Sequence, residues 1–489
     1  MNSAPAAEPV REFKHGLGLL DSTMIVIGSM IGSGIFIVSA DIARTVGCGG
    51  MLLLVWLVTG VLTVIGALSY GELGGLLPHA GGQYVYLREA YNPLIGFLYG
   101  WTLFLVIQTG TIAAVAVAFA KFTAVLVPAL GERHVLLQIA GLKISAAQIV
   151  AIASIAVLTF VNTRGLREGK IVQNVFTMTK TLALLGLIAL GVTIGRNAGA
   201  VQANLSSFWH ATWTHMAEGK ILSVEPLSGL MLLAVMGTAM VGSLFASVAW
   251  ENVTFTAGEV VNPRRTIPLC LALGTGVVTL LYIMANVAYI SVLPVSGSPE
   301  AADVVGRGIQ FAASDRVGTA AATMIFGDTA AVIMAVLIMI STFGCNNGII
   351  LAGARVYYAM ARDGVFFRGA GVLNAKAVPA AALVVQGIWA SLLCLSGTYG
   401  QLLDYVVFAV LIFYILTVIG IFILRRKRPD AERPYKAIGY PVIPALYVLC
   451  ASAIAVDLLV LKPAYTWPGM IIVLLGIPVY FIWRRRAKV

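Results

Sequence analysis

The sequence predicts an all-α membrane protein with twelve transmembrane helices, and three observations support that prediction. Hydrophobic residues make up 59% of the 489 residues and charged residues only 11%, against about 25% charged residues in soluble domains. The charged residues cluster between apolar runs that reach the length of about 20 residues needed for a helix to cross the bilayer. Lys and Arg are also distributed unequally between the two sides of these runs, as membrane topology requires.

Twelve apolar runs satisfy the length criterion. The third, sixth and eighth are longer than the bilayer is thick, so we expect them to tilt or to extend into water. The expected spans are residues 17–45, 50–77, 93–127, 146–162, 171–195, 226–260, 267–293, 326–360, 379–397, 401–424, 441–461 and 466–483.

The distribution of basic residues predicts the orientation of the chain. With the N-terminus inside, 22 of the 32 Lys and Arg lie in inner segments, nine lie in outer segments, and Lys180 lies within a span. This bias places both termini in the cytoplasm, with an N-terminal tail over 1–16 and a basic tail over 484–489. The first tail has no apolar core followed by a cleavage site, so we do not expect a cleaved signal peptide.

Composition argues against two other classes of protein. The formal charge of +11 is explained mostly by the topological bias, and without a separate basic domain we expect no nucleic-acid partner. The cysteines and histidines show no metal-ligand spacing, so we expect neither a zinc site nor another cofactor. They are Cys48, Cys270, Cys345, Cys394 and Cys450, and His15, His79, His134, His210 and His215.

Residues 28–34 (GSMIGSG) interrupt the first apolar run with three glycines and two serines. Each Gly in a helix interior costs about 1 kcal/mol relative to Ala, so this stretch favours a break in the helix. A broken helix within a membrane typically faces a binding site, where its free N–H groups hold an anion and its free carbonyls hold a cation or ammonium group. The alternative is that the small residues only allow two helices to pack closely.

Lys180 is the most informative charged residue. It follows the expected start of the fifth span by nine residues, which places it about 13 Å from the inner end at about 1.5 Å per residue. A charge near the midplane costs at least about 2.5 kcal/mol, so we expect it to face a cavity or a partner. It could take the place of a coupling cation or carry a proton, and the alternative is a structural lysine that holds carbonyl groups together.

The second interrupted stretch is 245–252 (FASVAWEN) in the sixth run. It contains neither Gly nor Pro, and taken alone it fits a patch of small residues that packs beside an interfacial Trp. Its position gives it more weight, because the sixth span corresponds to the first if the chain contains two inverted halves of five spans.

Several other polar residues within or near the spans could have a role. Glu72, Glu259 and Arg355 lie near inner helix ends and predict a gate-like or structural ion network. In the eighth run, five polar side chains could line a cavity or bond across helices. They are Ser341, Thr342, Cys345, Asn346 and Asn347. A nucleophile with its base, a phosphate loop and a carboxylate pair are all lacking, so an enzyme has no predicted active site.

Taken together, several motifs resemble the amino acid–polyamine–organocation transporters and, within them, the L-type amino acid transporter family. The resemblance covers nearly the whole chain, and each motif is modest alone but specific in this order. The matching stretches are 28–36 (GSMIGSGIF), 78–90 (PHAGGQYVYLREA), 254–263 (TFTAGEVVNP), 358–364 (YAMARDG), 433–435 (RPY) and 439–441 (GYP).

The resemblance implies a LeuT-like fold. In this fold, 17–195 (spans 1–5) and 226–424 (spans 6–10) are inverted repeats, and 441–483 adds two peripheral helices. It also implies a substrate site of main-chain groups, in which the amides of Ser33 and Gly34 hold the substrate carboxylate. The carbonyls of Met30, Phe245 and Val248 would receive the ammonium group, and Phe245 would also close the outer side. The implied substrate-binding residues are Gly28, Met30, Ile31, Gly32, Ser33, Gly34, Phe245, Ala246 and Val248.

By the same resemblance, Lys180 matches the lysine that replaces one sodium ion in sodium-independent relatives, with Gly32 and Ser341 as its expected neighbours. The chain departs from the family pattern in two places. At the position of Val248 many relatives carry Gly or Asp, and at the position of Ala249 they often carry Gly. The larger, uncharged residues of this chain imply a narrower, uncharged pocket for the substrate side chain. The loop at 131–145 lacks the cysteine that links animal light chains to a heavy chain. We therefore expect a free-standing transporter in a bacterial inner membrane.

These observations favour sodium-independent transport of neutral L-amino acids, by exchange and alternating access. A proton-coupled symporter, or a transporter of cationic amino acids or polyamines, is the alternative on the same scaffold. A membrane enzyme or receptor would need a cluster of catalytic or metal-binding side chains, which the sequence lacks.

Overall fold

The computed structural model describes residues 12–132, 134–139, 142–217, 220–396, 399–461 and 463–486. Most of the expected N-terminal tail and the last three residues of the chain therefore lie outside the described residues. Eleven helices in the described part are long and apolar enough to cross a membrane, and α17, apolar over Ala380–Leu395, is a shorter twelfth. This agrees with the twelve spans expected from the sequence.

Three of the twelve spans, the first, the third and the sixth, are divided into shorter helical pieces. In chain order, the twelve spans are α1 (Leu19–Met30) with α2 (Gly34–Ile37) and α3 (Ser39–Val46), α4 (Gly49–Leu76), α6 (Pro93–Thr102) with α7 (Gln108–Leu126), α8 (Ala146–Thr163), α9 (Leu166–Val192), α11 (Gly229–Ala246) with α12 (Asn252–Phe255), α13 (Pro263–Val292), α16 (Ala330–Arg362), α17 (Ala380–Ser396), α18 (Tyr399–Lys427), α19 (Val442–Leu461) and α20 (Pro463–Arg486).

Shorter elements connect the spans. The helices among them are α5 (Gln83–Ala90), α10 (Ala198–Ser206), α14 (Val304–Arg307) and α15 (Val317–Phe326). The strands β1 (Val135–Ile139) and β2 (Leu142–Ser145) form one antiparallel pair, and β3 (Thr212–Ala217) and β4 (Lys220–Pro226) form another. Short 3₁₀ turns lie at Pro128–Leu130, Ala257–Glu259, Ala313–Asp315, Gly327–Thr329 and Arg368–Gly371.

Three expected spans differ from the structure in ways that have local causes. The third is divided by a π-helical turn at Leu103–Ile107. The fifth begins at Leu166, directly after Gly165, whose φ of 150° is unsuitable for a helical residue. The sixth is not continuous over 226–260, because α11 ends at Ala246 and α12 begins only at Asn252.

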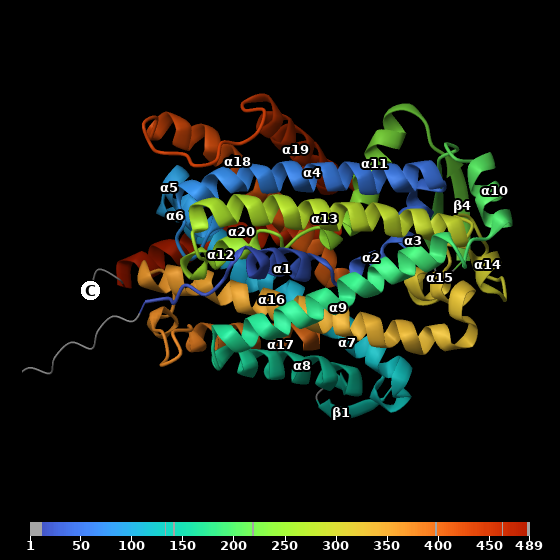
Figure 1. Ribbon diagram of the computed structural model, residues 1–489, viewed down its shortest axis with the longest axis horizontal. Coiled ribbons are helices and arrows are strands. Elements are labelled where there is room, and N and C mark those ends of the chain that lie inside the picture. Colours follow the sequence, from blue (N-terminus) through green and yellow to red (C-terminus); the bar gives the residue numbers. More distant parts are fainter. Residues whose placement is uncertain are drawn as a thin grey trace, which may run out of the picture.

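Figure 1 shows the helices running along a common long axis, with the described ends of the chain at the same end of the bundle. We call this the terminal end. The hairpin of β3 and β4, together with α10 and α14, lies at the opposite end, which we call the hairpin end. The hairpin packs closely against the bundle, because a Cβ at Gly47 would lie 2.0 Å from the Thr212 hydroxyl oxygen.

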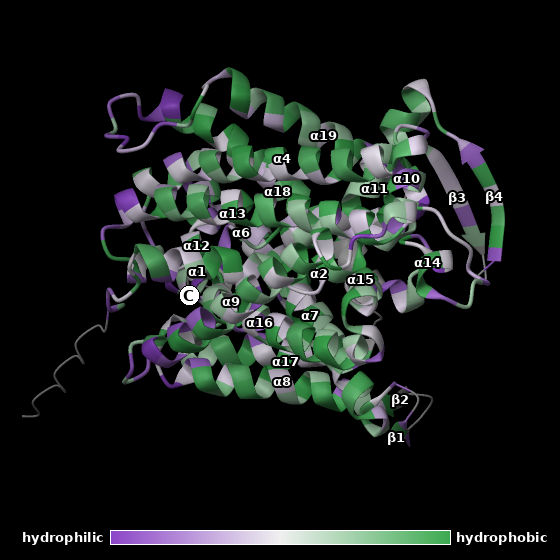
Figure 2. Ribbon diagram, turned by 45° about the vertical axis from the view of Figure 1, so that its right-hand side comes forward, coloured by the Kyte–Doolittle hydropathy of each residue, from purple (hydrophilic) through white to green (hydrophobic). Residues whose placement is uncertain are grey.

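The exposed and buried residues of helix α9 indicate that the fold is suited to a lipid environment. Its apolar side chains Met178 and Leu182 are 58% and 60% exposed, whereas its polar side chains Thr177 and Lys180 are buried. This reverses the pattern of a helix in a water-soluble protein and places the apolar face against lipid. Figure 2 shows the same pattern across the bundle, with apolar residues along the helix sides and hydrophilic residues concentrated near the helix ends.

Candidate functional site

The centre of the bundle contains two interrupted helices. The first helical segment, α1, ends at Met30, the next residue Ile31 has extended backbone angles (φ −75°, ψ 93°), and α2 begins at Gly34. In the sixth span, Ala249 has a left-handed φ of 70° between α11 and α12. We call these the first break and the second break.

Lys180 of α9 reaches the first break. Its Nζ donates hydrogen bonds to the carbonyl oxygens of Gly28 (2.6 Å), Ile31 (2.6 Å) and Ser341 (3.3 Å). The side chain is 2% exposed. Hydrogen bonds to a charged group contribute about 1.5–3 kcal/mol each, so the ammonium satisfies carbonyl groups that the interrupted helix leaves without helical partners.

The expected neighbours of Lys180 require one correction. Ser341 is a direct partner through its carbonyl, but Gly32 is not. The Gly32 carbonyl instead accepts a hydrogen bond from Ser341 Oγ at 3.0 Å, and the same hydroxyl lies 3.1 Å from the Ile31 carbonyl oxygen. Gly28 and Ile31, expected to contact the substrate, turn their carbonyls toward Lys180.

A small cavity of about 20 Å³ lies between the two breaks. It has room for about one water molecule, so an amino acid can enter only if the surrounding elements move. The cavity is lined by Ser29, Met30, Gly32, Ser33, Gly34, Thr111, Val115, Phe245, Ala246, Val248, Ala249 and Cys345. Seven of the nine residues expected to bind substrate are among them, and the other two are Gly28 and Ile31.

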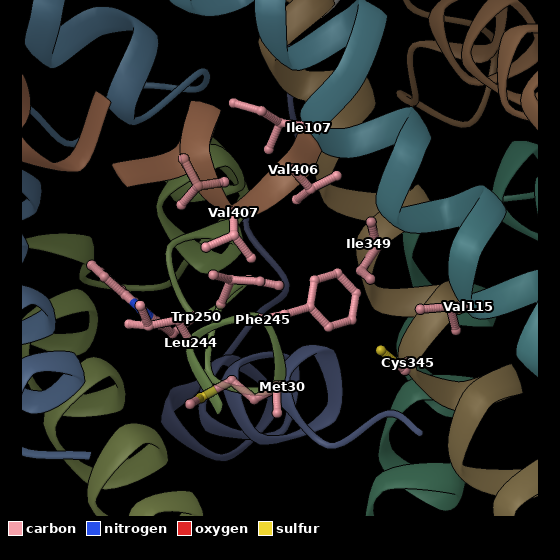
Figure 3. Packing of buried hydrophobic residues seen from close by; sticks show 14 of the residues in the cluster. Met30, Ile107, Val115, Leu244, Phe245, Trp250, Cys345, Ile349, Val406 and Val407 are labelled. Carbon is pink, nitrogen blue, oxygen red and sulfur yellow. The ribbon is translucent and has the colours of Figure 1, made fainter. Parts of the chain in front are cut away.

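The two breaks determine how the side chains are arranged around the cavity. In Figure 3, the Phe245 ring points toward Val115 of α7 and toward Ile349 and Cys345 of α16, whereas Trp250 lies on the opposite side of the second break. Cys345 is one of the polar residues of the eighth run that the sequence offered for lining a cavity or bonding across helices, and it lines this cavity. Val115 was not predicted from the sequence, because it lies in a long apolar run where nothing distinguishes a residue that lines a cavity from one that packs against another helix.

Tyr282 of α13 connects the two breaks. Its hydroxyl lies 2.9 Å from the carbonyl oxygen of Met30 and 3.1 Å from that of Ala246. The Met30 carbonyl, expected to receive the substrate ammonium, is therefore already bonded to Tyr282 and retains one further lone pair. The only signal for Tyr282 in the sequence is a polar tip within an apolar run, and a buried Tyr generally finds a partner for its hydroxyl.

The glycines of the first break provide close contact between segments. A Cβ added to Gly28 would lie 1.9 Å from Gln173 Nε2, and one added to Gly34 would lie 2.7 Å from the Ala246 Cβ. Neither glycine is among the described residues with a positive φ. Gly28 therefore allows helices to pack, as in the alternative interpretation, and Gly34 lets the two breaks approach each other.

The expected ion network is divided into two separate groups at the terminal end. Arg355 binds Glu259 through two hydrogen bonds of 2.8 and 2.9 Å, and both side chains are 1% exposed. Glu72 instead pairs with Arg425 at 2.7 and 2.9 Å and with Arg433 at 3.4 Å. The Glu259 carbonyl also accepts hydrogen bonds from the amides of Gly16 and Leu17, which ties the N-terminal segment to the turn that follows α12.

The cavity and both breaks lie within the region covered by a known family. The amino acid permease family matches residues 17–482. The chain belongs to this family. It is therefore a multi-pass membrane transporter and not an enzyme. In the described part of the chain, no group of three or more His, Cys, Asp or Glu could hold a metal ion.

Relatives cover almost the whole chain. It is 31% identical over 480 residues to the large neutral amino acids transporter small subunit 2 of Rattus norvegicus, covering 97% of this chain and 82% of the relative. It is 28% identical over 475 residues to the b(0,+)-type amino acid transporter 1 of Mus musculus, covering 96% and 87%. For the Asc-type amino acid transporter 1 of Mus musculus the identity is 29% over 484 residues, covering 97% and 83%.

Proposed function

We propose that the chain exchanges neutral L-amino acids across a membrane by alternating access, without sodium. The observation that carries this proposal is the position of the Lys180 ammonium, which binds two carbonyl oxygens at the first break and a third, of Ser341, in α16. Carbonyl oxygens at an interrupted helix are typical ligands for a coupling sodium ion in transporters. A fixed ammonium in that position supplies the positive charge and leaves no need for the ion.

The substrate site of this proposal consists of the two breaks. The amides of Ser33 and Gly34 bind the substrate carboxylate, because the start of a helical segment presents N–H groups and a partial positive charge. Main-chain carbonyls of Met30, Phe245 and Val248 receive the ammonium. Ala246 completes the wall between the breaks, and its carbonyl is held by Tyr282.

The relatives and the lining residues support neutral substrates. One of the three named relatives is described as a transporter of large neutral amino acids. Phe245, Val248 and Val115 give the cavity an apolar wall, and it is lined by no charged side chain among the described residues. A cationic amino acid or a polyamine would bring a second charge into this apolar space, which is unfavourable without a partner.

Membrane placement and partners are further parts of the proposal. We infer that the terminal end faces the cytoplasm, because the excess of Lys and Arg lies there, and that the chain resides in a bacterial inner membrane. Two inverted repeats over 17–195 and 226–424 would place the breaks in equivalent spans. Because 131–145 contains no cysteine, we propose that no heavy chain is attached through a disulfide in this loop.

Transport by the purified protein in liposomes tests the function. Radiolabelled neutral amino acid should accumulate when the liposomes contain unlabelled amino acid, with equal rates in sodium and in choline buffer. Uptake that requires sodium, or that is unaffected by internal amino acid, would contradict sodium-independent exchange. A screen of the twenty amino acids for thermal stabilisation identifies the substrates, because a ligand stabilises by RT ln(1 + [L]/Kd).

The proton-coupled alternative predicts a different result. An imposed pH gradient would then drive accumulation into liposomes that contain no amino acid. If Lys180 were the proton carrier, Lys180→Ala would change the pH dependence of that accumulation.

A further inference from the structure

An open pocket of about 690 Å³ lies between the end of α16 and the last turns of α20, which reaches the terminal end (Figure 1). Arg362, the last residue of α16, lines one side of it together with Arg368 of the following 3₁₀ turn. Ile482 and Trp483 of α20 line the other side. The residues of this pocket are separate from those that line the cavity between the breaks.

The two arginines of this pocket are not paired with an acid. Within the described part of the chain, neither Arg362 nor Arg368 forms a salt bridge, and both are exposed. Asp363, which follows Arg362, is bonded to Tyr84 and Arg88 instead. The described residues that line the pocket include no acidic side chain. Two guanidinium groups beside one pocket give it a local positive charge, which favours an anion as the ligand.

Aromatic side chains form the floor of the pocket. The Phe366 ring is stacked on Trp483 with 6.4 Å between the ring centroids, and the Phe367 ring meets Trp483 edge to face at 5.4 Å. Phe366 is buried, whereas Phe367 is 53% exposed. Membrane topology explains why basic residues are common at this end, but an exposed aromatic surface beside them is typical of the level of the lipid headgroups.

An apolar stripe on α20 leads away from the pocket. Its residues follow one another at intervals of four, four and three and therefore lie on one face of the helix; they are Ile471, Leu475, Val479 and Ile482. Ile471, Leu475 and Ile482 are 52%, 53% and 56% exposed, and Val479 and Ile482 also line the pocket. From 482 back to 471 the helix rises by about 16 Å, at about 1.5 Å per residue. This length matches half of a bilayer core of about 30 Å, the depth that one acyl chain covers.

We propose that this pocket binds one anionic phospholipid. The phosphodiester lies against Arg362 and Arg368, because a guanidinium group presents parallel N–H donors that match two phosphate oxygens. The glycerol packs on Phe367 and Trp483, and one acyl chain follows the stripe on α20. A free phosphate would satisfy the arginines but would leave the aromatic floor and the stripe uncovered, so the lipid is the better ligand. The inference requires only that the chain spans a membrane and does not depend on the amino acid that it transports.

The test is a titration of the purified protein in detergent with dioleoyl phosphatidylglycerol, with dioleoyl phosphatidylcholine as the lipid without net charge. Thermal unfolding reports binding, because a ligand raises stability according to its concentration and Kd, and native mass spectrometry counts the lipids that stay bound. The apparent Kd for phosphatidylglycerol should be lower by about tenfold or more, the contribution of one hydrogen bond to a charged group. The same Kd for the two lipids would overturn the proposal.

Two double variants separate a site from general surface charge. Arg362→Gln with Arg368→Gln removes both guanidinium groups and should abolish the preference for phosphatidylglycerol. Arg265→Gln with Arg426→Gln removes two other exposed arginines, which form no salt bridge among the described residues and do not line the pocket, and should keep it. An equal loss in both would contradict a specific site. If the first double variant fails to fold, Arg368→Gln alone, outside the long helices, should raise the Kd by about tenfold, and an unchanged Kd would contradict the proposal.

Soluble phosphates distinguish a lipid from a small anion. Glycerol 3-phosphate and inorganic phosphate carry a phosphate without acyl chains and should not stabilise the wild-type protein at the concentration at which phosphatidylglycerol saturates it. Stabilisation by either one that is lost in the variant without Arg362 and Arg368 would make the pocket a site for free phosphate and overturn the lipid. Because these measurements need no transport, a protein that binds the lipid but exchanges no amino acid contradicts only the proposed function, and the reverse result contradicts only this inference.

Discussion

The two breaks in the bundle reach similar backbone interruptions by opposite means. The first contains three glycines, yet none of them is among the described residues with a positive φ, and a lysine from another helix binds its carbonyl groups. The second contains no glycine and places Ala249 in the left-handed region, with the buried acid Glu251 two residues later. A basic side chain therefore serves one break and an acidic one lies in the other.

This difference separates two roles that are often both assigned to glycine. In the first break, glycine provides close approach, because the space of a Cβ at Gly34 is taken by Ala246. The conformational freedom that glycine offers would be useful at position 249, where the chain instead carries the cost of a left-handed Ala, about 1–2 kcal/mol. Exchanges between Gly and Ala should consequently have opposite effects in the two breaks. Gly34→Ala should be harmful, whereas Ala249→Gly should stabilise the folded protein.

The largest effect is expected at Lys180. Lys180→Ala leaves the carbonyls of Gly28, Ile31 and Ser341 without the ammonium that they bind. Losing one member of a buried charged site costs about 3–5 kcal/mol, so exchange in liposomes should fall by about 100-fold or more. Met178→Ala on the lipid-facing side of the same helix is the control and should leave exchange within about twofold. Equal activity of the two variants would show that the first break does not depend on the ammonium.

A smaller but still severe effect is expected from Gly34→Ala. The added Cβ would lie 2.7 Å from the Ala246 Cβ and 3.1 Å from its Cα, so the two breaks would have to separate. Substrate-induced thermal stabilisation should be lost even if the protein folds. Gly186→Ala in α9 meets no atom within 4 Å and should leave stabilisation intact. A Gly34→Ala variant with normal affinity would contradict the role of close approach.

Tyr282→Phe tests the link between the breaks. It removes the single O–H donor that the Met30 and Ala246 carbonyls share, and a hydrogen bond to a buried neutral group contributes about 0.5–1.5 kcal/mol. The apparent Kd for substrate should rise by about threefold to about tenfold. Tyr289→Phe, whose hydroxyl lies 3.2 Å from the Ile35 carbonyl oxygen beyond the first break, provides the comparison. If Tyr289→Phe weakens binding as much as Tyr282→Phe, the link has no special role.

The fold and the first break could be predicted because their signals are local. Each span is an apolar run of sufficient length, and the glycines and serines of 28–34 form a dense cluster within one run. Lys180 was also recognisable, because a charge so far from a helix end needs a partner. The sequence named Gly32 as an expected neighbour of Lys180, but the ammonium bonds to the adjacent Ile31 carbonyl instead. The direction of each carbonyl depends on the backbone angles of the individual residues in the break.

The second break and its surroundings depend on tertiary structure. Nothing in the local composition of 245–252 predicts a left-handed Ala249, and the interruption was expected mainly from its correspondence to the first span. Tyr282, Val115 and Cys345 come from three other helices and meet the breaks only in the folded bundle. Packing partners of this kind follow from which helix faces meet, and hydropathy alone does not determine this.

The smallest effect, and the one with the opposite sign, is expected from Ala249→Gly. Glycine adopts a positive φ without the steric cost of a Cβ, so the folded protein should gain up to about 1 kcal/mol, reduced by the greater freedom of glycine in the unfolded chain. A matched change in the helix before the break, Ala234→Gly in α11, should instead destabilise by about 1 kcal/mol. Thermal unfolding of the two variants in the same detergent measures the difference, and a loss of stability in both would mean that Ala249 is not strained. Because Ala249 also lines the cavity between the breaks, the gain should come with slightly weaker discrimination against larger substrates, measured by competition in the exchange assay.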